Sequence, residues 1–192
     1  REISEQTIRD FQLGYSKDNF EDVEKHLLNE GYSKQELIEA GLLLERDNGD
    51  TCDRFRNRLM FPIRDIKGQV IGFGARSLDD SLPKYMNSPQ TLVFDKSSNL
   101  YAIDRAKEFI RKNNEVTIME GYMDVLTAHQ HGWNNSIASM GTALTEKQLT
   151  ILKKLSNTII LALDADIAGI AANSRTVEKL GIADFTKILK TD

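Results

Sequence analysis

The fold is decided by two stretches of sequence, Val116–Asp124 (VTIMEGYMD) and Ile159–Asp166 (IILALDAD). In each stretch a short, largely apolar run, typical of a buried strand, ends directly at a carboxylate, which is Glu120 in the first and Asp164 in the second. In open parallel sheets the ligand site lies at the carboxyl ends of the strands. We therefore expect these carboxylates to meet at one edge of a parallel sheet.

The chain around these stretches alternates between strand and helix from Asn99 onward. Strands are predicted at Val116–Met119, Ser136–Ser139, Thr158–Leu163 and Phe185–Leu189. Helices are predicted at 100–110, Tyr122–His131, Thr145–Leu155 and Ile167–Leu180. Because parallel strands need crossover connections, this alternation predicts a small doubly wound, Rossmann-like unit with helices on both faces of a parallel sheet.

The first half of the chain has a different pattern. Three short helices are expected, with Ser4, Asp18 and Ser33 as their capping residues. Strands are predicted at Leu42–Arg46, Leu59–Arg64 and Gln69–Arg76, with a turn at 65–68 and a loop with one short strand at 82–96. The fold class is therefore α/β, with an α+β lobe at residues 1–98 followed by the Rossmann-like lobe at residues 99–192.

Composition narrows the class of protein. Of the 192 residues, 40% are hydrophobic and 28% are charged, which is an ordinary balance for a globular protein. No apolar run approaches the roughly 20 residues that span a bilayer, and residues 1–10 do not resemble a signal segment. Cys52 is the single cysteine, so it can form neither an internal disulfide nor a thiolate zinc site, and we expect it to have a structural role. The absence of disulfides agrees with a reducing compartment, so we expect the protein to be cytoplasmic.

The net charge of −4 is unevenly distributed. Residues 1–50 have six Lys and Arg against thirteen Asp and Glu, whereas residues 51–105 have nine against six. A locally basic segment is compatible with contact with phosphates, although on charge alone a solvated surface is the more common explanation.

Carboxylates at the two strand ends predict a metal site. Asp124 follows Glu120 by four residues and can share its helix face, and Asp166 lies two residues after Asp164. Clustered carboxylates repel one another unless a cation neutralises them, and hard oxygen ligands favour Mg²⁺ or Mn²⁺. For either cluster taken alone, the alternative to metal binding is that the carboxylate caps the helix that follows it.

Basic and polar residues in the middle segment are candidates for binding phosphates. Arg54, Arg56 and Arg58 alternate along a run expected to be extended, so a strand would place all three on one side. Further candidates for binding a triphosphate or a single strand are Arg76, Lys84, Tyr85, Asn87 and Lys96. A salt-bridged surface is the alternative.

Several motifs together resemble one family. Residues 120–124 (EGYMD) and 164–169 (DADIAG) are similar to the Toprim fold, which bacterial primases share with topoisomerases and some nucleases. The order and spacing of five further motifs resemble the catalytic core of bacterial DNA primases: residues 54–63 (RFRNRLMFPI), 72–76 (GFGAR), 83–89 (PKYMNSP), 94–96 (FDK) and 140–144 (MGTAL). Ala75 and Ala165 stand where the family usually has glycine.

This resemblance implies DNA-templated synthesis of short RNA primers on single-stranded DNA by metal-dependent nucleotidyl transfer. It implies that Glu120, Asp164 and Asp166 hold Mg²⁺ or Mn²⁺, with Asp124 in support. It also implies that the basic set binds nucleoside triphosphates and template, with the RNA primer as product.

The family's zinc-binding module, its helicase-binding module and a further acidic loop are absent from this sequence. We therefore expect a monomeric, nucleoid-associated core fragment truncated at its C-terminal end. Zinc and the replicative helicase would bind only to the absent modules, no membrane is involved, and primer synthesis by the fragment alone would be weak or absent.

Two other functions remain open. A Toprim-fold nuclease would use the same carboxylates, and a non-catalytic module that binds nucleic acid or nucleotides would keep the fold without the chemistry. A topoisomerase needs large DNA gates, for which 192 residues leave no room.

Overall fold

The computed structural model describes residues 2–79, 81–141 and 144–163, together with the backbone of 186–190. These residues form two compact units. The first, here called the parallel unit, comprises Arg1–Asp10, Arg64–Gln69 and Lys96–Asp192. The second, the antiparallel unit, comprises Phe11–Ile63 and Val70–Asp95. The division into domains at residues 1–98 and 99–192 stays a proposal.

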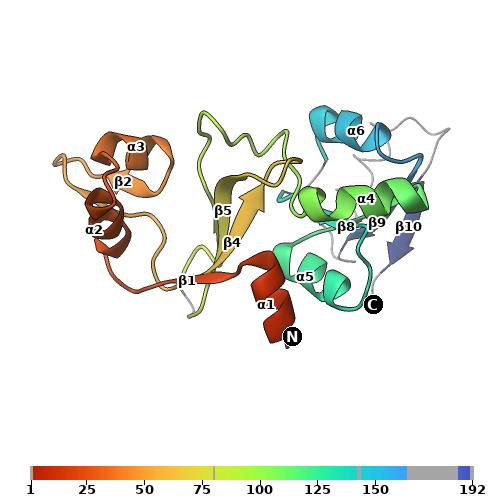
Figure 1. Ribbon diagram of the computed structural model, residues 1–192, viewed down its shortest axis with the longest axis horizontal. Helices are drawn as coiled ribbons and strands as arrows, with labels where there is room; N and C mark the ends of the chain where they lie inside the picture. The colour runs from red at the N-terminus through yellow and green to blue at the C-terminus, as the bar shows by residue number, and fades with distance from the viewer. Residues whose placement is uncertain (1, 80, 142–143, 164–185, 191–192) are drawn as a thin grey trace. The chain divides into compact units, whose positions relative to one another are not determined.

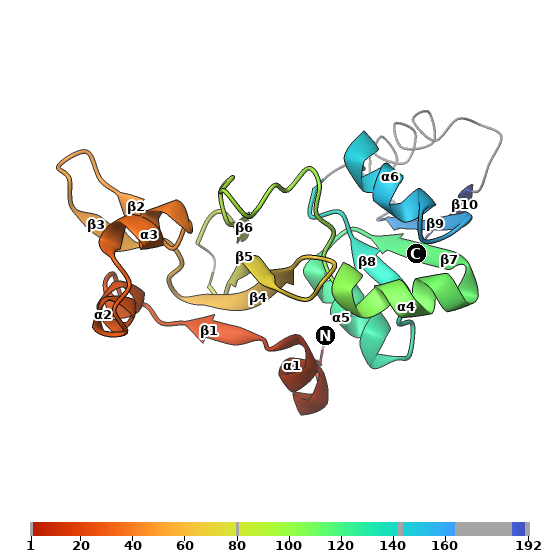
Figure 2. The same ribbon diagram turned by 45° about the horizontal axis from the view of Figure 1, so that its top comes forward.

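The sheet of the parallel unit has the strand order β10-β9-β7-β8. Its strands are β7 (Glu115–Met119), β8 (Ser136–Ala138), β9 (Thr158–Leu163) and β10 (Thr186–Lys190). All neighbouring pairs run parallel, and Figure 2 shows β7, β8 and β9 side by side. The predicted parallel sheet is confirmed. The predicted helix at Ile167–Leu180 lies outside the described residues.

Helices cover both faces of this sheet. They are α4 (Ile103–Asn113), α5 (Tyr122–Gln130) and α6 (Glu146–Lys153), and α1 (Glu5–Phe11) begins in this unit. Apolar side chains of α4 and α6 form one core with Val116 and Ile118 of β7. Thr117 points to the opposite face because side chains alternate along a strand, and it is also buried. The alternation of helices and strands therefore gives the two covered faces that the sequence predicts.

The antiparallel unit contains a sheet with the order β1-β4-β5-β6 and a separate two-stranded sheet. The strands of the larger sheet are β1 (Gly14–Ser16), β4 (Arg58–Arg64), β5 (Val70–Ser77) and β6 (Tyr85–Asn87). The smaller sheet pairs β2 (Leu43–Glu45) with β3 (Thr51–Asp53), and the helices are α2 (Asp22–Asn29) and α3 (Lys34–Glu39). Figure 1 shows α2 and α3 grouped with β2. The sequence did not predict the three-residue strands β1 and β3.

The turn between β4 and β5 has the predicted position. Gly68 has a φ of 91°, in the left-handed region that favours glycine, and its N–H donates to the carbonyl of Asp65. The Asp65 carboxylate accepts the N–H groups of Lys67 and Gln69, both at 2.9 Å. Backbone and side-chain hydrogen bonds together fix the turn.

Two of the three predicted helix caps are confirmed, and the third is wrong. Ser4 accepts the N–H of Thr7 at the start of α1, and Ser33 forms a capping box at the start of α3. Asp18 does not cap α2, which begins at Asp22. The Asp53 carboxylate accepts the N–H groups at the start of this helix instead, because β3 brings Asp53 beside it.

Cys52 is buried in β3, in agreement with a structural role. Within the described ranges, no helix combines the length and hydrophobicity needed to cross a lipid bilayer.

Candidate metal and nucleotide site

Glu120 lies at the carboxyl end of the central strand pair of the parallel unit. Met119, the last residue of β7, is in register with Ala162 of β9 and with Ala138 of β8. Glu120 follows directly and is half-buried. The predicted position of this carboxylate at the sheet edge is confirmed.

The other two predicted metal ligands, Asp164 and Asp166, lie outside the described residues. In sequence, Asp164 directly follows Leu163, the last residue of β9. Because β9 is the parallel neighbour of β7, the backbone leaves both strands at the same edge of the sheet.

Asp124 stabilises the start of α5. Its Oδ2 accepts the backbone N–H of Gly121 at 3.1 Å, three residues earlier. A Cβ placed on Gly121 would lie 3.3 Å from this oxygen, so glycine lets the carboxylate approach closely. The observed contact of Asp124 is therefore a helix cap, which was the alternative to metal binding. The same hydrogen bond holds the backbone next to Glu120.

The carboxylates at this edge are hard oxygen donors, which fit Mg²⁺ or Mn²⁺ better than zinc. Among the residues that the structure describes, no group of three or more His, Cys, Asp or Glu side chains is arranged to hold a metal ion. Glu120 is one hard oxygen donor among the described residues at this edge.

Lys96 belongs to the same compact unit as Glu120. Its side chain lies against the loop that follows β8, where a Cβ placed on Gly141 would be 3.5 Å from Lys96 Cε and 3.8 Å from Nζ. The exposed ammonium group is thus close to the MGTAL motif identified in the sequence.

In the antiparallel unit, three candidate residues share one face of the β5–β6 ladder. Arg76 is directly opposite Tyr85, and Asn87 is opposite Gly74. Opposed residues of an antiparallel pair lie on the same face, as do residues two apart along a strand. The Arg76 guanidinium carbon lies 5.7 Å from the centroid of the Tyr85 ring, and Tyr85 is 41% exposed. Lys84, the residue before β6, is exposed. This face combines a cation, an aromatic ring and an amide.

The three arginines at 54, 56 and 58 do not share one face of a strand, so that prediction is wrong. Asn57 has a φ of 49°, which breaks the extended run, and only Arg58 lies in β4. Arg58 is 7% exposed, and its Nη1 donates to the carbonyl of Pro83 at 2.8 Å. Arg58 therefore fixes the loop next to Lys84.

Arg54 and Arg56 have different surroundings. Burial lowers the pKa of the Arg54 guanidinium, and its buried Nε has no hydrogen-bond partner within the described part of the chain. Arg56 donates to the Asp53 carbonyl, and its guanidinium carbon lies 4.5 Å from the centroid of the Phe20 ring. Arg54 thus keeps one buried donor without a partner among the described residues, whereas Arg56 is held by Phe20, which precedes α2, and by Asp53 of β3.

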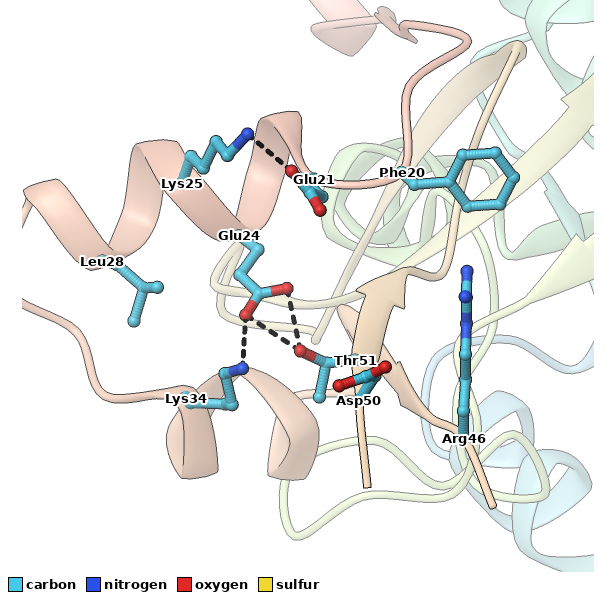
Figure 3. Close-up of a pocket in the computed structure, with 9 residues that line it drawn as sticks. All are labelled: Phe20, Glu21, Glu24, Lys25, Leu28, Lys34, Arg46, Asp50 and Thr51. Carbon is cyan, nitrogen blue, oxygen red and sulfur yellow. Dashed lines mark hydrogen bonds and ion pairs between the residues drawn. The ribbon is translucent and has the colours of Figure 1, made fainter. Parts of the chain in front are cut away.

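Figure 3 shows a pocket of about 690 Å³ in the antiparallel unit. Lys34 Nζ lies 2.8 Å from Glu24 Oε1, and Thr51 donates to the same carboxylate. Lys25 forms an ion pair with Glu21 at 2.5 Å. These contacts engage most of the charged groups on the walls with one another, and none of the predicted site residues lines the pocket. The pocket is a structural feature of the helical region rather than part of the candidate site.

Two buried polar residues near the site were missed by sequence reasoning. Asp53 is 2% exposed, and its carboxylate accepts two backbone N–H groups at the start of α2. Gln148 is 1% exposed and belongs to the capping box of α6 with Thr145. The spacing Thr145-x-x-Gln148 is the capping-box signature, so this signal was present in the sequence.

Comparisons with known proteins agree with the motifs. Residues 1–107 match the family described as the DNA primase catalytic core, N-terminal domain, and residues 117–191 match the Toprim-like family. A DNA primase from Clostridium acetobutylicum is 47% identical over 99% of the chain.

Solved structures show the same fold. The chain is similar to a DNA primase domain from Pseudomonas aeruginosa, with a TM-score of 0.91 and 38% identity over 98% of this chain and 60% of that one. It is also similar to the DnaG primase catalytic domain bound to single-stranded DNA, with a TM-score of 0.84 and 38% identity over 92% of this chain and 55% of that one. The chain spans about a third of the length of the curated relatives that it matches.

Proposed function

The chain belongs to the family of DNA primase catalytic cores, and from this premise we propose that it copies single-stranded DNA into short RNA primers by metal-dependent nucleotidyl transfer. The observation that carries the proposal is the position of Glu120, directly after β7 and beside the strand that leads to Asp164. The similar primase structure with bound single-stranded DNA supports single-stranded DNA as the class of template.

Glu120, Asp164 and Asp166 would together hold Mg²⁺ or Mn²⁺. When bound, such cations stabilise the charge that develops on the attacking and leaving oxygens of a phosphoryl transfer. Asp124 would keep Glu120 in place through its hydrogen bond to Gly121.

The basic residues would bind the substrates. Arg76, Tyr85 and Asn87 present a cation, a ring and an amide on one face, which suits a base stacked beside a held phosphate. Lys84 and Lys96 would contribute charge toward the triphosphate, and Arg54 would contribute charge toward template or nucleotide. Arg56 and Arg58 would support template or nucleotide contacts, Arg58 by fixing the loop before Lys84.

The partners of this core would be the DNA template, nucleoside triphosphates and the RNA product, and it would act as a monomer at the bacterial nucleoid.

The test is a reaction of the chain with end-labelled single-stranded DNA, nucleoside triphosphates and Mg²⁺ or Mn²⁺. We expect nucleotide binding and slow, metal-dependent RNA synthesis. Cleavage of the DNA without added nucleotides would instead identify a nuclease. Binding of DNA with no metal-dependent binding of nucleotides would identify a non-catalytic module.

A further inference from the structure

Gln148 is a buried amide that no role in the proposed reaction explains. It lies in the first turn of α6, where its Oε1 accepts the N–H of Thr145 at 3.0 Å and its own N–H donates to Thr145 Oγ1 at 3.1 Å. These two bonds complete the capping box. They use the acceptor of the side chain and leave its two Nε2 hydrogens for other partners.

Those hydrogens bind two separate loops of the parallel unit. Gln148 Nε2 lies 2.8 Å from the carbonyl oxygen of Asn99, 3.2 Å from that of Lys96 and 3.3 Å from that of Ser139. Since the amide has two hydrogens for three oxygens, at least one hydrogen is shared. Buried carbonyls without a donor are costly, so the contacts specify where both loops lie.

Thr145 strengthens the same arrangement. Its hydroxyl donates to the carbonyl of Ser97, so the capping box of α6 contacts three carbonyls within the segment 96–99. A capping box ordinarily serves only its own helix. Here it also holds the segment that begins with Lys96.

The second loop lies under the Lys96 side chain. Ser139, whose carbonyl accepts from Gln148, donates through its hydroxyl to the carbonyl of Gly141 at 2.8 Å. A Cβ placed on Gly141 would lie 3.5 Å from Lys96 Cε, so the Lys96 side chain lies close to this loop. Gln148 therefore contacts both the backbone of Lys96 and the loop against which its side chain rests.

We propose that Gln148 is a positioning residue for nucleotide binding, which sets the place of the Lys96 ammonium by joining the segment 96–99 to the loop after β8. The inference rests on the proposed role of Lys96 in binding the triphosphate. Gln148 acts through Lys96 and touches neither nucleotide nor metal.

The experiment compares Mn²⁺-dependent binding of a nucleoside triphosphate, by calorimetry, to the wild-type chain, Lys96→Ala, Gln148→Met and the double variant. Methionine keeps about the length and volume of glutamine and removes both the amide donors and the amide oxygen that accepts the N–H of Thr145. We expect Lys96→Ala and Gln148→Met each to weaken binding by about tenfold, a change that corresponds to the loss of about one hydrogen bond to a charged group. If Gln148 acts through Lys96, the double variant is no weaker than Lys96→Ala alone.

Two further variants complete the design. Thr150→Ala removes a side-chain hydrogen bond on the same helix, from Thr150 to Glu146, that does not reach either loop, and it should bind as the wild type does. Gln148→Asn keeps the amide but withdraws it by one methylene, so an intermediate loss is expected even if the methionine variant fails to fold.

Hydrogen exchange of the nucleotide-free chain tests the positioning separately. Peptides covering 96–100 should exchange faster in the Gln148 variants than in the wild type, and unchanged exchange would overturn the inference. So would additive effects of the two substitutions on binding, or normal binding by the Gln148 variants. If Lys96→Ala binds normally, the proposed function of Lys96 fails first and the inference fails with it.

Discussion

The two units position their charged side chains in different ways. In the parallel unit, Glu120 is placed by topology, because a residue that follows a central parallel strand must lie at the carboxyl edge of the sheet. In the antiparallel unit, Arg56 and Arg58 are placed by individual side-chain contacts that differ between the two, and Arg54 is placed by burial of its guanidinium.

This difference affects how each unit responds to substitution. For removal of the carboxylate at the end of β7 we expect a small effect on the fold, because backbone hydrogen bonds and the apolar core hold the sheet. For removal of a buried polar residue such as Asp53 or Arg58 we expect a larger one, because its hydrogen bonds are part of the fold. The predictions below test this contrast, from the largest expected effect to the smallest.

Glu120→Gln should weaken Mn²⁺ binding by about 100-fold while leaving the stability of the chain nearly unchanged, because the substitution removes a charged ligand without changing volume. Electron paramagnetic resonance of Mn²⁺ and urea unfolding measure the two effects. Glu115→Gln is the matched control at the other end of β7 and should bind Mn²⁺ normally. Equal loss in both variants would show that general charge, rather than the strand end, attracts the cation.

Asp53→Ala should lower the free energy of unfolding by about 2 kcal/mol, because it removes the acceptor of two backbone N–H groups at the start of α2. Urea unfolding measures the loss. Asp50→Ala is a suitable control, since Asp50 is exposed and accepts a hydrogen bond from the side chain of Asn48 in the same region. Similar losses in the two variants would contradict the assignment of Asp53 as the cap.

Tyr85→Ala should weaken binding of single-stranded DNA or nucleotide by about 1 kcal/mol, the lower end of the range for stacking of one base on an aromatic ring. Fluorescence anisotropy with a labelled oligonucleotide measures the change. Tyr15→Ala is the control, because Tyr15 is also an exposed tyrosine of the same sheet, in β1. A loss confined to Tyr15→Ala would place the stacking surface elsewhere.

Glu24→Gln should produce the smallest effect, a change in the pH dependence of stability. The hydrogen bond from Lys34 lowers the pKa of Glu24 below its ordinary value of 4.5, and the hydrogen bond from Thr51 acts in the same direction against partial burial. A carboxylate with a depressed folded-state pKa stabilises the fold above its unfolded pKa and loses this contribution as the pH falls through the folded-state pKa. The wild type should therefore lose stability below about pH 4.5, and the variant should lose less.

Thermal unfolding of both proteins between pH 3 and pH 7 measures this difference. Parallel pH curves would mean that the ion pair of Glu24 and Lys34 does not contribute to folding.

Much of the parallel unit could be predicted from the sequence, because residues close together in the chain determine its strands and the starts of its helices. Apolar strands, the capping residue Thr145 and a carboxylate directly after β7 are all read from consecutive residues. The turn with Gly68 is local in the same sense.

The sequence was less informative where distant residues decide the structure. Asp18 is a reasonable cap by local spacing, but Asp53, from a strand 30 residues after the start of the helix, takes that place. The alternation of three arginines suggested a strand, and the left-handed backbone of Asn57 interrupts it. Gln148 could be identified as part of a capping box, whereas its three carbonyl partners on two other loops are visible only in the fold.

The central claim is that the carboxylates after β7 and β9 form the metal site of a nucleotidyl transferase. The most direct test is calorimetry of Mn²⁺-dependent nucleoside triphosphate binding to the wild-type chain and to the double variant Asp164→Ala, Asp166→Ala. We predict metal-dependent binding by the wild type and its loss in the double variant. Nucleotide binding that needs neither the metal nor these carboxylates would contradict the claim and leave only a basic surface that holds phosphates.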